Sequence, residues 1–407
     1  MKRLSKEQKA LLELLGAALF GKEPQIPEEI DWPTVAEEAM TQAVLPLAVQ
    51  AMGERIPEEL RAKFAEKADA AIIHNMSMEW EHITLHEWLS EAEIPYVILK
   101  GSASAAWYPT PMLRMMGDVD FLVDPKDEAR AAALLREKGF VRGDVTPEDA
   151  SYFRKNPDGE LVELELHHSV KGIPAGTAGE RTAACLADLI GTALLHETEN
   201  GSYRVPDAFH HGLILLLHTA NHMINSGVGL RHLCDWAVFV NRFSPEDFCA
   251  LFEEKLRTIG LWRFARLLTA LCTETLGSRE QPWAALDAEP ELLEAMREDI
   301  FAAGNFGGKD EQRLNQAKLM TDKSKGGVDD TGMLRQLVLT MNEKARHAMP
   351  AAEKVPALLP AGWIYAGGRH LVRIALGRSP RIKLKEMVEG AAERREIYRR
   401  FHLFETE

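Results

Sequence analysis

Two aspartates with one residue between them, Asp118 and Asp120, follow a Gly-Ser pair in a stretch rich in strand-forming residues. Alternate side chains of an extended strand share a face, so we expect both carboxylates to point to the same side. Two convergent carboxylates repel each other unless a cation or a proton lies between them, and Mg²⁺ prefers such oxygen ligands. Gly101 and Ser102 end an apolar run, and a turn there lets backbone amides approach phosphate oxygens closely. These residues predict a metal-dependent site for phosphoryl or nucleotidyl transfer.

A third acidic group is predicted on the second strand of a hairpin. A Pro-Asp-Gly turn at 157–159 separates two β-prone runs, which is a hairpin signal. The second run places Glu163, Glu165 and His167 on one face of the strand and apolar residues on the other. Either glutamate could complete the acidic cluster.

Residues 97–124 resemble the DNA polymerase β-like nucleotidyltransferase superfamily, whose signature is an apolar residue, Gly-Gly or Gly-Ser, a short helix, and Asp-x-Asp on a strand. Within it, the chain looks like the family of uncharacterised bacterial nucleotidyltransferases, which also has a later Glu-Leu-His sequence. The matching residues are Leu99-Lys100-Gly101, Tyr108, Arg114, the run 117–123 and Glu165-Leu166-His167. The resemblance implies an α+β fold, with a small mixed β-sheet nucleotidyltransferase core flanked by N- and C-terminal all-helical regions.

The resemblance also implies nucleotidyl transfer with two Mg²⁺ ions. Asp118 and Asp120 would ligate both ions, and Glu165 would ligate the ion nearest the attacking hydroxyl or act as general base, with Glu163 as the second choice. A nucleoside monophosphate would pass from an NTP, with ATP the expected donor, to an acceptor hydroxyl. The acceptor, whether a small molecule, a protein or an RNA, is not indicated by any motif.

Four residues are predicted to bind the nucleotide: Lys100, Gly101, Ser102 and Arg114. The two cations would offer positive charge to a triphosphate whose negative charge grows on the leaving pyrophosphate. Ser102 could donate a hydrogen bond to a phosphate oxygen. Two of these residues also have a plain structural interpretation, Lys100 as a solvent-facing lysine at a strand end and Ser102 as a helix N-cap.

A predicted helix at 207–225 carries His218 and His222 on one face. No acidic residue accompanies them, so a pair hydrogen-bonded to the backbone or to Asp235 is favoured over a metal site. Arg231 and Asp235 are spaced for an ion pair within the following helix. The functional alternative is that this helical region walls the nucleotide cleft, with Arg231 or His222 reaching the triphosphate.

Hydrophobic periodicity and composition divide the chain into five regions. They are a helical N-terminal region (1–91), a catalytic domain (92–205), a helical domain (206–303), a flexible linker (304–331) and a helical C-terminal region (332–407). Within the catalytic domain, strands are predicted at 94–99, at 117–123 and near 140–142, and helices at 102–108 and 126–138.

Composition limits the possible classes of protein. With 407 residues and 46% hydrophobic content, the chain can bury a large core in two or three domains. A formal charge of −14 argues against broad nonspecific binding to nucleic acid. The 4 cysteines form no paired metal motif and no disulfide framework. With no signal-type apolar core at the start and no run near the ~20 apolar residues that span a bilayer, we expect a cytoplasmic protein without a membrane partner.

Residues 369–385 contain basic but no acidic side chains. They could hold an anionic acceptor such as tRNA or a phosphorylated metabolite, although such runs more often form a solvated helix face. Two other functions stay open. One is a catalytically silent nucleotide-binding or scaffold protein, and the other is a metal-dependent phosphohydrolase, against which His167-His168 lacks a following aspartate. If the carboxylates repel one another, Asp120→Asn should abolish transfer and leave the fold intact or more stable.

Overall fold

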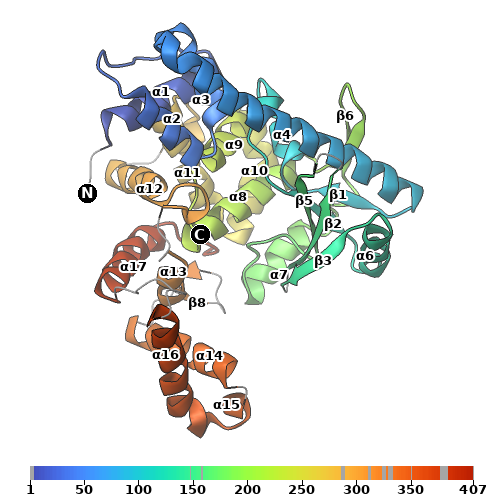
Figure 1. Ribbon diagram of the computed structural model, residues 1–407, viewed down its shortest axis with the longest axis vertical. Coiled ribbons are helices and arrows are strands. Elements are labelled where there is room, and N and C mark those ends of the chain that lie inside the picture. The colour runs from blue at the N-terminus through green and yellow to red at the C-terminus, as the bar shows by residue number, and fades with distance from the viewer. Residues whose placement is uncertain are drawn as a thin grey trace.

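A five-stranded mixed sheet carries the acidic residues at one side of a largely helical molecule (Figure 1). The computed structural model describes residues 4–146, 148–156, 159–285, 289–309, 313–322, 327–328, 333–349, 351–375 and 384–406. The α+β class and the flanking helical regions agree with the prediction from the sequence.

The sheet has the strand order β1-β2-β5-β4-β3. Its strands are β1 (Tyr96–Ile98), β2 (Val119–Val123), β3 (Val141–Val145), β4 (Asp149–Lys155) and β5 (Leu161–His167). Strands β2 and β5 are parallel, and the other pairs are antiparallel. The predicted hairpin is confirmed, because β4 pairs with β5 along its whole length.

The register of the sheet brings distant acidic residues together. Asp120 on β2 lies directly opposite Glu165 on β5. Partners in register project to the same side, and alternate residues of a strand share a face, so His167 joins these two carboxylates on one face. The opposite face of β5 holds Leu164 and Leu166, both 1% exposed.

Two helices cover the apolar face of the sheet. Helix α6 (Glu128–Glu137) contributes Leu135, and helix α4 (Glu58–Glu91) contributes Leu85 and Leu89 to the same hydrophobic cluster. Burying one such side chain stabilises the fold by about 1.5–3 kcal/mol. Helix α4 has 34 residues, and at 1.5 Å per residue it extends about 51 Å. In Figure 1 it crosses from the helical part of the molecule to the sheet.

The first and the middle helices share one hydrophobic cluster. Leu11 and Leu15 from α1 lie in the same cluster as Leu216 from α8, Trp236 from α9 and Leu268 from α11. The helices of this body are α1 (Lys6–Phe20), α2 (Trp32–Thr41), α3 (Leu45–Met52), α8 (Ala208–Ile224), α9 (Leu230–Val240), α10 (Pro245–Ile259), α11 (Trp262–Leu276) and α12 (Pro290–Ala303). The N-terminal helices therefore pack against the helices beyond residue 206 as well as on the catalytic region.

The remaining elements are short or lie toward the C-terminus. They are α5 (Ser102–Ala105), α7 (Gly176–Cys185), the pair β6 (Leu194–Glu197) and β7 (Ser202–Val205), α13 (Arg313–Met320), the pair β8 (Thr321–Asp322) and β9 (Gly327–Val328), α14 (Met333–Ala348), α15 (Ala351–Lys354), α16 (Leu359–Ala375) and α17 (Leu384–Arg399). The 3₁₀ turns are η1 (Gly53–Arg55), η2 (Pro111–Leu113), η3 (Pro282–Ala284), η4 (Asn305–Gly307) and η5 (Pro356–Leu358). Helices α14, α15 and α16 project as an arm at the lower end of Figure 1.

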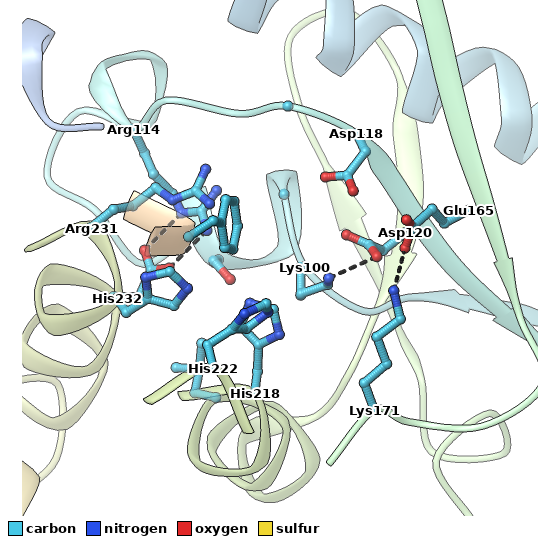
Figure 2. Close-up of a pocket in the computed structure, with 16 residues that line it drawn as sticks. Lys100, Arg114, Asp118, Asp120, Glu165, Lys171, His218, His222, Arg231 and His232 are labelled. Atoms are coloured by element: carbon cyan, nitrogen blue, oxygen red, sulfur yellow. Dashed lines mark hydrogen bonds and ion pairs between the residues drawn. The ribbon is translucent and has the colours of Figure 1, made fainter. Parts of the chain in front are cut away.

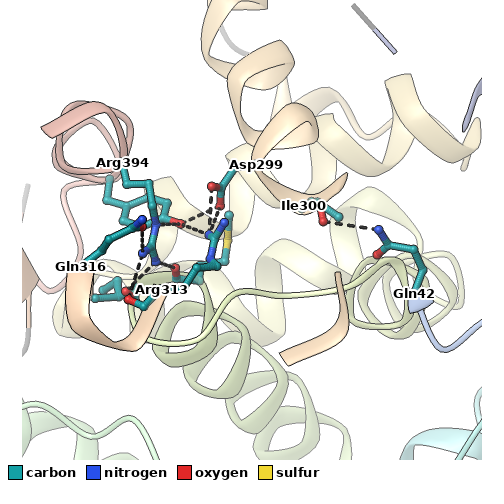
Figure 3. Close-up of polar contacts among 9 residues, drawn as sticks. Gln42, Asp299, Ile300, Arg313, Gln316 and Arg394 are labelled. Carbon is teal, nitrogen blue, oxygen red and sulfur yellow. Dashed lines mark hydrogen bonds and ion pairs between the residues drawn. The ribbon is translucent and has the colours of Figure 1, made fainter. Parts of the chain in front are cut away.

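The segment 304–331 differs from the predicted loop, because helix α13 lies within it. Arg313, at the start of α13, is 3% exposed and pairs with Asp299 of α12 at 2.7 Å. Arg394 of α17 donates to the carbonyls of Met223 and Ile224 at the end of α8, which ties the C-terminal helices to the central body (Figure 3). Such long-range partners are not visible in local composition. Of the basic stretch, residues 376–383 lie outside the described part of the chain.

A buried glutamine joins three helices of the body (Figure 3). Gln42, which follows α2, is fully buried. Its side-chain oxygen accepts from the backbone N–H of Leu230 at the start of α9, and its amide donates to the carbonyl of Ile300 in α12. These bonds fix the start of α9, the helix that carries Arg231 and His232.

Within the described residues, no helix combines the length and the apolar character that crossing a membrane would require.

Candidate active site

A cavity of about 160 Å³ lies between the polar face of the sheet and helices α8 and α9 (Figure 2). One side is lined by Asp118, Asp120 and Glu165. The three carboxylates that the sequence predicts as metal ligands therefore line one cavity. The other side is lined by His218, His222, Arg231 and His232.

Asp120, Glu165 and His167 form a group of side chains in the described part of the chain that could hold a metal ion. One ligand atom from each lies within 4.8 Å of the other two. Asp118, in the loop just before β2, lines the cavity but stands outside this group. The sequence did not single out His167 as a ligand, although the alternation along β5 placed it on the acidic face.

Asp120 is the buried centre of the acidic side, with 1% of its surface exposed. Its Oδ1 lies 2.8 Å from Lys100 Nζ and 2.7 Å from His167 Nε2. Burial by itself raises the pKa of this carboxyl, but Lys100 and His167 outweigh burial and hold the pKa well below its usual value. Burial likewise lowers the pKa of His167, and its hydrogen bonds to Asp120 and Glu165 reverse that effect and raise it. In the structure Lys100 therefore neutralises a carboxylate, where the sequence predicted that it binds phosphate.

Asp118 is in the opposite electrostatic situation. The charge of Asp120, followed by burial, raises the pKa of the Asp118 carboxyl, and Lys100 offsets only part of this effect. A divalent cation beside Asp118 would relieve the repulsion.

Glu165 is held by a lysine that follows β5. Lys171 Nζ lies 2.8 Å from Glu165 Oε2 and also pairs with Asp149 of β4. Burial lowers the pKa of Lys171, but these two carboxylates raise it above its usual value. Glu163, the second choice from the sequence, lies on the same face of β5. Burial raises its pKa, and the charges of Asp118 and Glu165 add to this effect. Its position two residues before Glu165 on β5 places Glu163 on the acidic side as well.

The turn after β1 requires glycine at position 101. Gly101 has φ 60° and ψ −118°, and a Cβ there would lie 3.2 Å from Nε2 of His82. Ser102 was predicted to donate to a phosphate oxygen. In the structure its hydroxyl lies 3.2 Å from His82 Nδ1 and 3.4 Å from the sulfur of Met116 instead. Ser104 lines the cavity instead, and its hydroxyl has no hydrogen-bond partner among the described residues. Ser104 was not predicted from the sequence, although it lies in the same short helix as Ser102 and could have been considered for that reason.

Arg114 binds Asp235, a carboxylate of α9 that also lines the cavity. Its Nε and one terminal nitrogen each donate to Asp235 at 2.7 Å, and the Tyr108 hydroxyl donates to the same carboxylate at 2.7 Å. Burial raises the pKa of Asp235, but Arg114, with smaller effects of Arg231 and Tyr108, outweighs burial and lowers it. The predicted ion pair between Arg231 and Asp235 is therefore wrong. Arg231 donates to the carbonyl of Met115 at 3.0 Å.

Three histidines form a cluster opposite the carboxylates. The ring centroids of His218 and His222 lie 4.3 Å apart, and the ring of His232 stacks on that of His218 at 5.3 Å. The predicted contact of this pair with Asp235 is not found, and His222 Nδ1 lies 2.8 Å from the Ser226 hydroxyl. Burial, followed by the charge of Lys100, lowers the pKa of His222 to about 3. Burial also lowers the pKa of His218 and of His232, so all three rings are neutral near pH 7.

Comparison with known proteins places these features in context. A family model described as "Uncharacterised nucleotidyltransferase" matches residues 28–277. No curated protein matches the chain. Among solved structures, an antigenic nucleotidyltransferase-like protein from Paracoccidioides brasiliensis is similar, with 17% sequence identity and a TM-score of 0.33. The similarity covers 49% of this chain and 92% of that chain.

Proposed function

The chain belongs to the uncharacterised nucleotidyltransferase family, and from this premise we propose that it transfers a nucleoside monophosphate from an NTP to an acceptor hydroxyl, with Mg²⁺ bound by its carboxylates. ATP is the expected donor, and the acceptor is a small molecule, a protein or an RNA. We also propose that the catalytic region is of the DNA polymerase β-like type.

One observation carries the proposal most directly. Asp118, Asp120 and Glu165 line a single cavity, and a turn that requires glycine leads into it at Gly101. The donor set is rich in carboxylate oxygen, which suits Mg²⁺. The raised pKa of Asp118, caused first by the charge of Asp120, indicates negative charge that a cation would stabilise. The residues present therefore fit the metal that the family implies.

In the proposed reaction the acceptor oxygen attacks the α-phosphorus of the NTP. The new P–O bond forms as the bond to pyrophosphate breaks, and the hydroxyl proton passes to Glu165 as general base. Asp118 and Asp120 would hold two Mg²⁺ ions, and Glu165 would also hold the ion near the acceptor. Bound Mg²⁺ supplies charge neutralisation of the phosphates and a lower pKa for the acceptor hydroxyl. Lys100 would be released from Asp120 and become free to bind a phosphate oxygen.

A second candidate is a silent nucleotide-binding or scaffold protein. It is favoured by the cations that already neutralise the acidic side, with Lys100 and His167 on Asp120 and Lys171 on Glu165. A site that never binds a metal would need such internal partners. The two candidates differ in whether nucleotide turns over.

Incubation with each of the four α-labelled NTPs, Mg²⁺ and a cell extract separates these candidates. The proposal expects label on an acceptor together with release of pyrophosphate, and loss of both in EDTA. Glu137→Gln, a substitution of an exposed residue on α6, should transfer normally and serves as the matched control. If no label is transferred and millimolar nucleotide with Mg²⁺ does not raise the melting temperature, the silent scaffold is favoured. Release of phosphate without labelling of an acceptor would indicate a hydrolase.

A further inference from the structure

The cavity side opposite the carboxylates consists of polar side chains with few partners in the protein. His218 and His222 extend from α8, and Arg231 and His232 extend from α9 (Figure 2). We call these four residues the helical wall. Phe306 of η4 lies beside them and is 46% exposed.

Several hydrogen-bonding atoms of the helical wall are buried and unused. His232 is 4% exposed, and neither of its ring nitrogens has a partner in the described part of the chain. The Nε of Arg231 is likewise without a partner there. Buried polar groups are nearly always hydrogen-bonded in native proteins. Their concentration along a cavity points to a ligand that completes these bonds.

The charge of Arg231 is offset only by carboxylates that do not contact it, those of Asp235 and Asp118. The carboxylate nearest in sequence, Asp235, is bound by two nitrogens of Arg114 and by the hydroxyl of Tyr108. No ion pair of Arg231 occurs among the residues that the structure describes, and the one hydrogen bond of its guanidinium group there goes to the carbonyl of Met115. The guanidinium group lies 5.2 Å from the ring centroid of Phe306, a contact that fixes its plane. A half-buried cation without a directly paired carboxylate is suited to bind an anion.

The helical wall is poorly suited to a metal ion. Its three histidines do not form a group of ligand atoms within 4.8 Å among the described residues, whereas Asp120, Glu165 and His167 do. Lys100 extends into the same cavity, and the charges of Lys100 and Arg231 would repel a cation bound there. Neutral imidazole N–H groups beside a guanidinium match the acceptor oxygens of a phosphate.

We propose that the helical wall is an oxyanion subsite that binds a phosphate group opposite the metal-binding carboxylates. This inference rests on the proposed function, in which the ligand is the outer phosphates of the NTP and then the leaving pyrophosphate. The other source of the same chemistry is a phosphate carried by the acceptor. Cation-binding groups on the sheet and anion-binding groups on the helices would together fix the direction in which the triphosphate lies.

Inorganic pyrophosphate is the probe, titrated calorimetrically into the full chain in EDTA, so that metal binding and catalysis play no part. The parent should bind, and Arg231→Gln should weaken binding by about tenfold or more. Arg242→Gln is the matched control. Arg242 lies just after α9 and, like Arg231, donates to a backbone carbonyl, that of Trp107, but its side chain is exposed. It should bind like the parent. His218→Gln should also weaken binding, and it tests the subsite if Arg231→Gln does not fold.

The outcomes separate this inference from the proposed function. Absence of pyrophosphate binding to the parent, or equal binding by the parent and both wall variants, would overturn the subsite even if label transfer is found. Binding that depends on Arg231 without label transfer would support the subsite and contradict the proposed function. Competition between ATP and pyrophosphate in EDTA would assign the wall to the phosphates of the nucleotide. Simultaneous binding would assign it to a phosphate of the acceptor.

Discussion

Asp118 and Asp120 should respond in opposite directions to the same substitution. Asp120 is 1% exposed and accepts from Lys100 and His167, and its pKa lies well below the usual value because these partners outweigh burial. Asp118 has a raised pKa, caused first by the charge of Asp120. Asparagine at 120 removes a negative charge that is paired with Lys100 and His167. Asparagine at 118 removes a negative charge that Asp120 repels.

The magnitudes follow from these contacts. Removing one partner of a buried ion pair costs about 3–5 kcal/mol. Asparagine keeps an acceptor oxygen, and His167 can release its proton, so Asp120→Asn should lower the free energy of unfolding by about 2–3 kcal/mol. Asp118→Asn should leave it unchanged or raise it by up to about 1 kcal/mol. This reverses the expectation from the sequence alone, which assumed that repulsion dominates at Asp120.

Urea denaturation in EDTA measures this difference, with Glu137→Gln as the control for loss of an exposed carboxylate. In Mg²⁺, both site variants should lose label transfer by at least about a hundredfold, because each removes a proposed metal ligand. The electrostatic account would be refuted if Asp120→Asn unfolded at the same urea concentration as the parent, or if Asp118→Asn were the less stable variant.

Three further outcomes are expected. The free energy of unfolding should fall from pH 6.5 to pH 5, because burial lowers the pKa of the three histidines of the helical wall in the folded protein. The unfolded chain therefore binds protons at a higher pH than the folded protein does. Each histidine contributes up to about 1.4 kcal/mol per pH unit to this fall. Urea midpoints should show a shallower pH slope in His222→Gln, and an unchanged slope would count against this origin. Arg114→Met should lower the free energy of unfolding by about 3–5 kcal/mol, because it leaves Asp235 buried without its cation. Arg231→Met should lower it clearly less. Equal losses of stability in thermal melts would contradict the assigned partners. Gly101→Ala should destabilise the turn by about 1–3 kcal/mol, because φ is 60° there, and denaturation at the parent's urea midpoint would show that the turn tolerates a side chain.

Local patterns in the sequence were sufficient for most of the fold. The alternation along β5 separated the acidic face from the buried leucines, and the Pro-Asp-Gly turn predicted the hairpin that places Glu165 beside Asp120. Both signals act over a few residues, where backbone geometry sets the direction of each side chain. Helix α13 was missed because the partner that stabilises its first residue, Asp299, belongs to another helix.

The partners of the site residues could not be predicted in the same way. Helical spacing suggested Arg231 for Asp235, but Arg114 occupies that carboxylate from 121 residues away in the sequence. The Gly-Ser pair suggested Ser102 for phosphate, yet its hydroxyl lies against His82, and Ser104 lines the cavity. Which of several nearby polar groups faces a cavity depends on how the helical body packs against the sheet, and short-range spacing does not contain that information.

Label transfer from an α-labelled NTP, measured for the parent and Asp118→Asn in the same extract, tests whether the acidic cavity supports nucleotidyl transfer. Asp118→Asn is the sharper variant because its fold should be at least as stable as that of the parent, so a loss of activity reports on metal binding. We expect a labelled acceptor for the parent in Mg²⁺ and none for the variant or in EDTA. Equal labelling by the two proteins, or a folded parent that labels nothing with any of the four NTPs, would refute nucleotidyl transfer at this site.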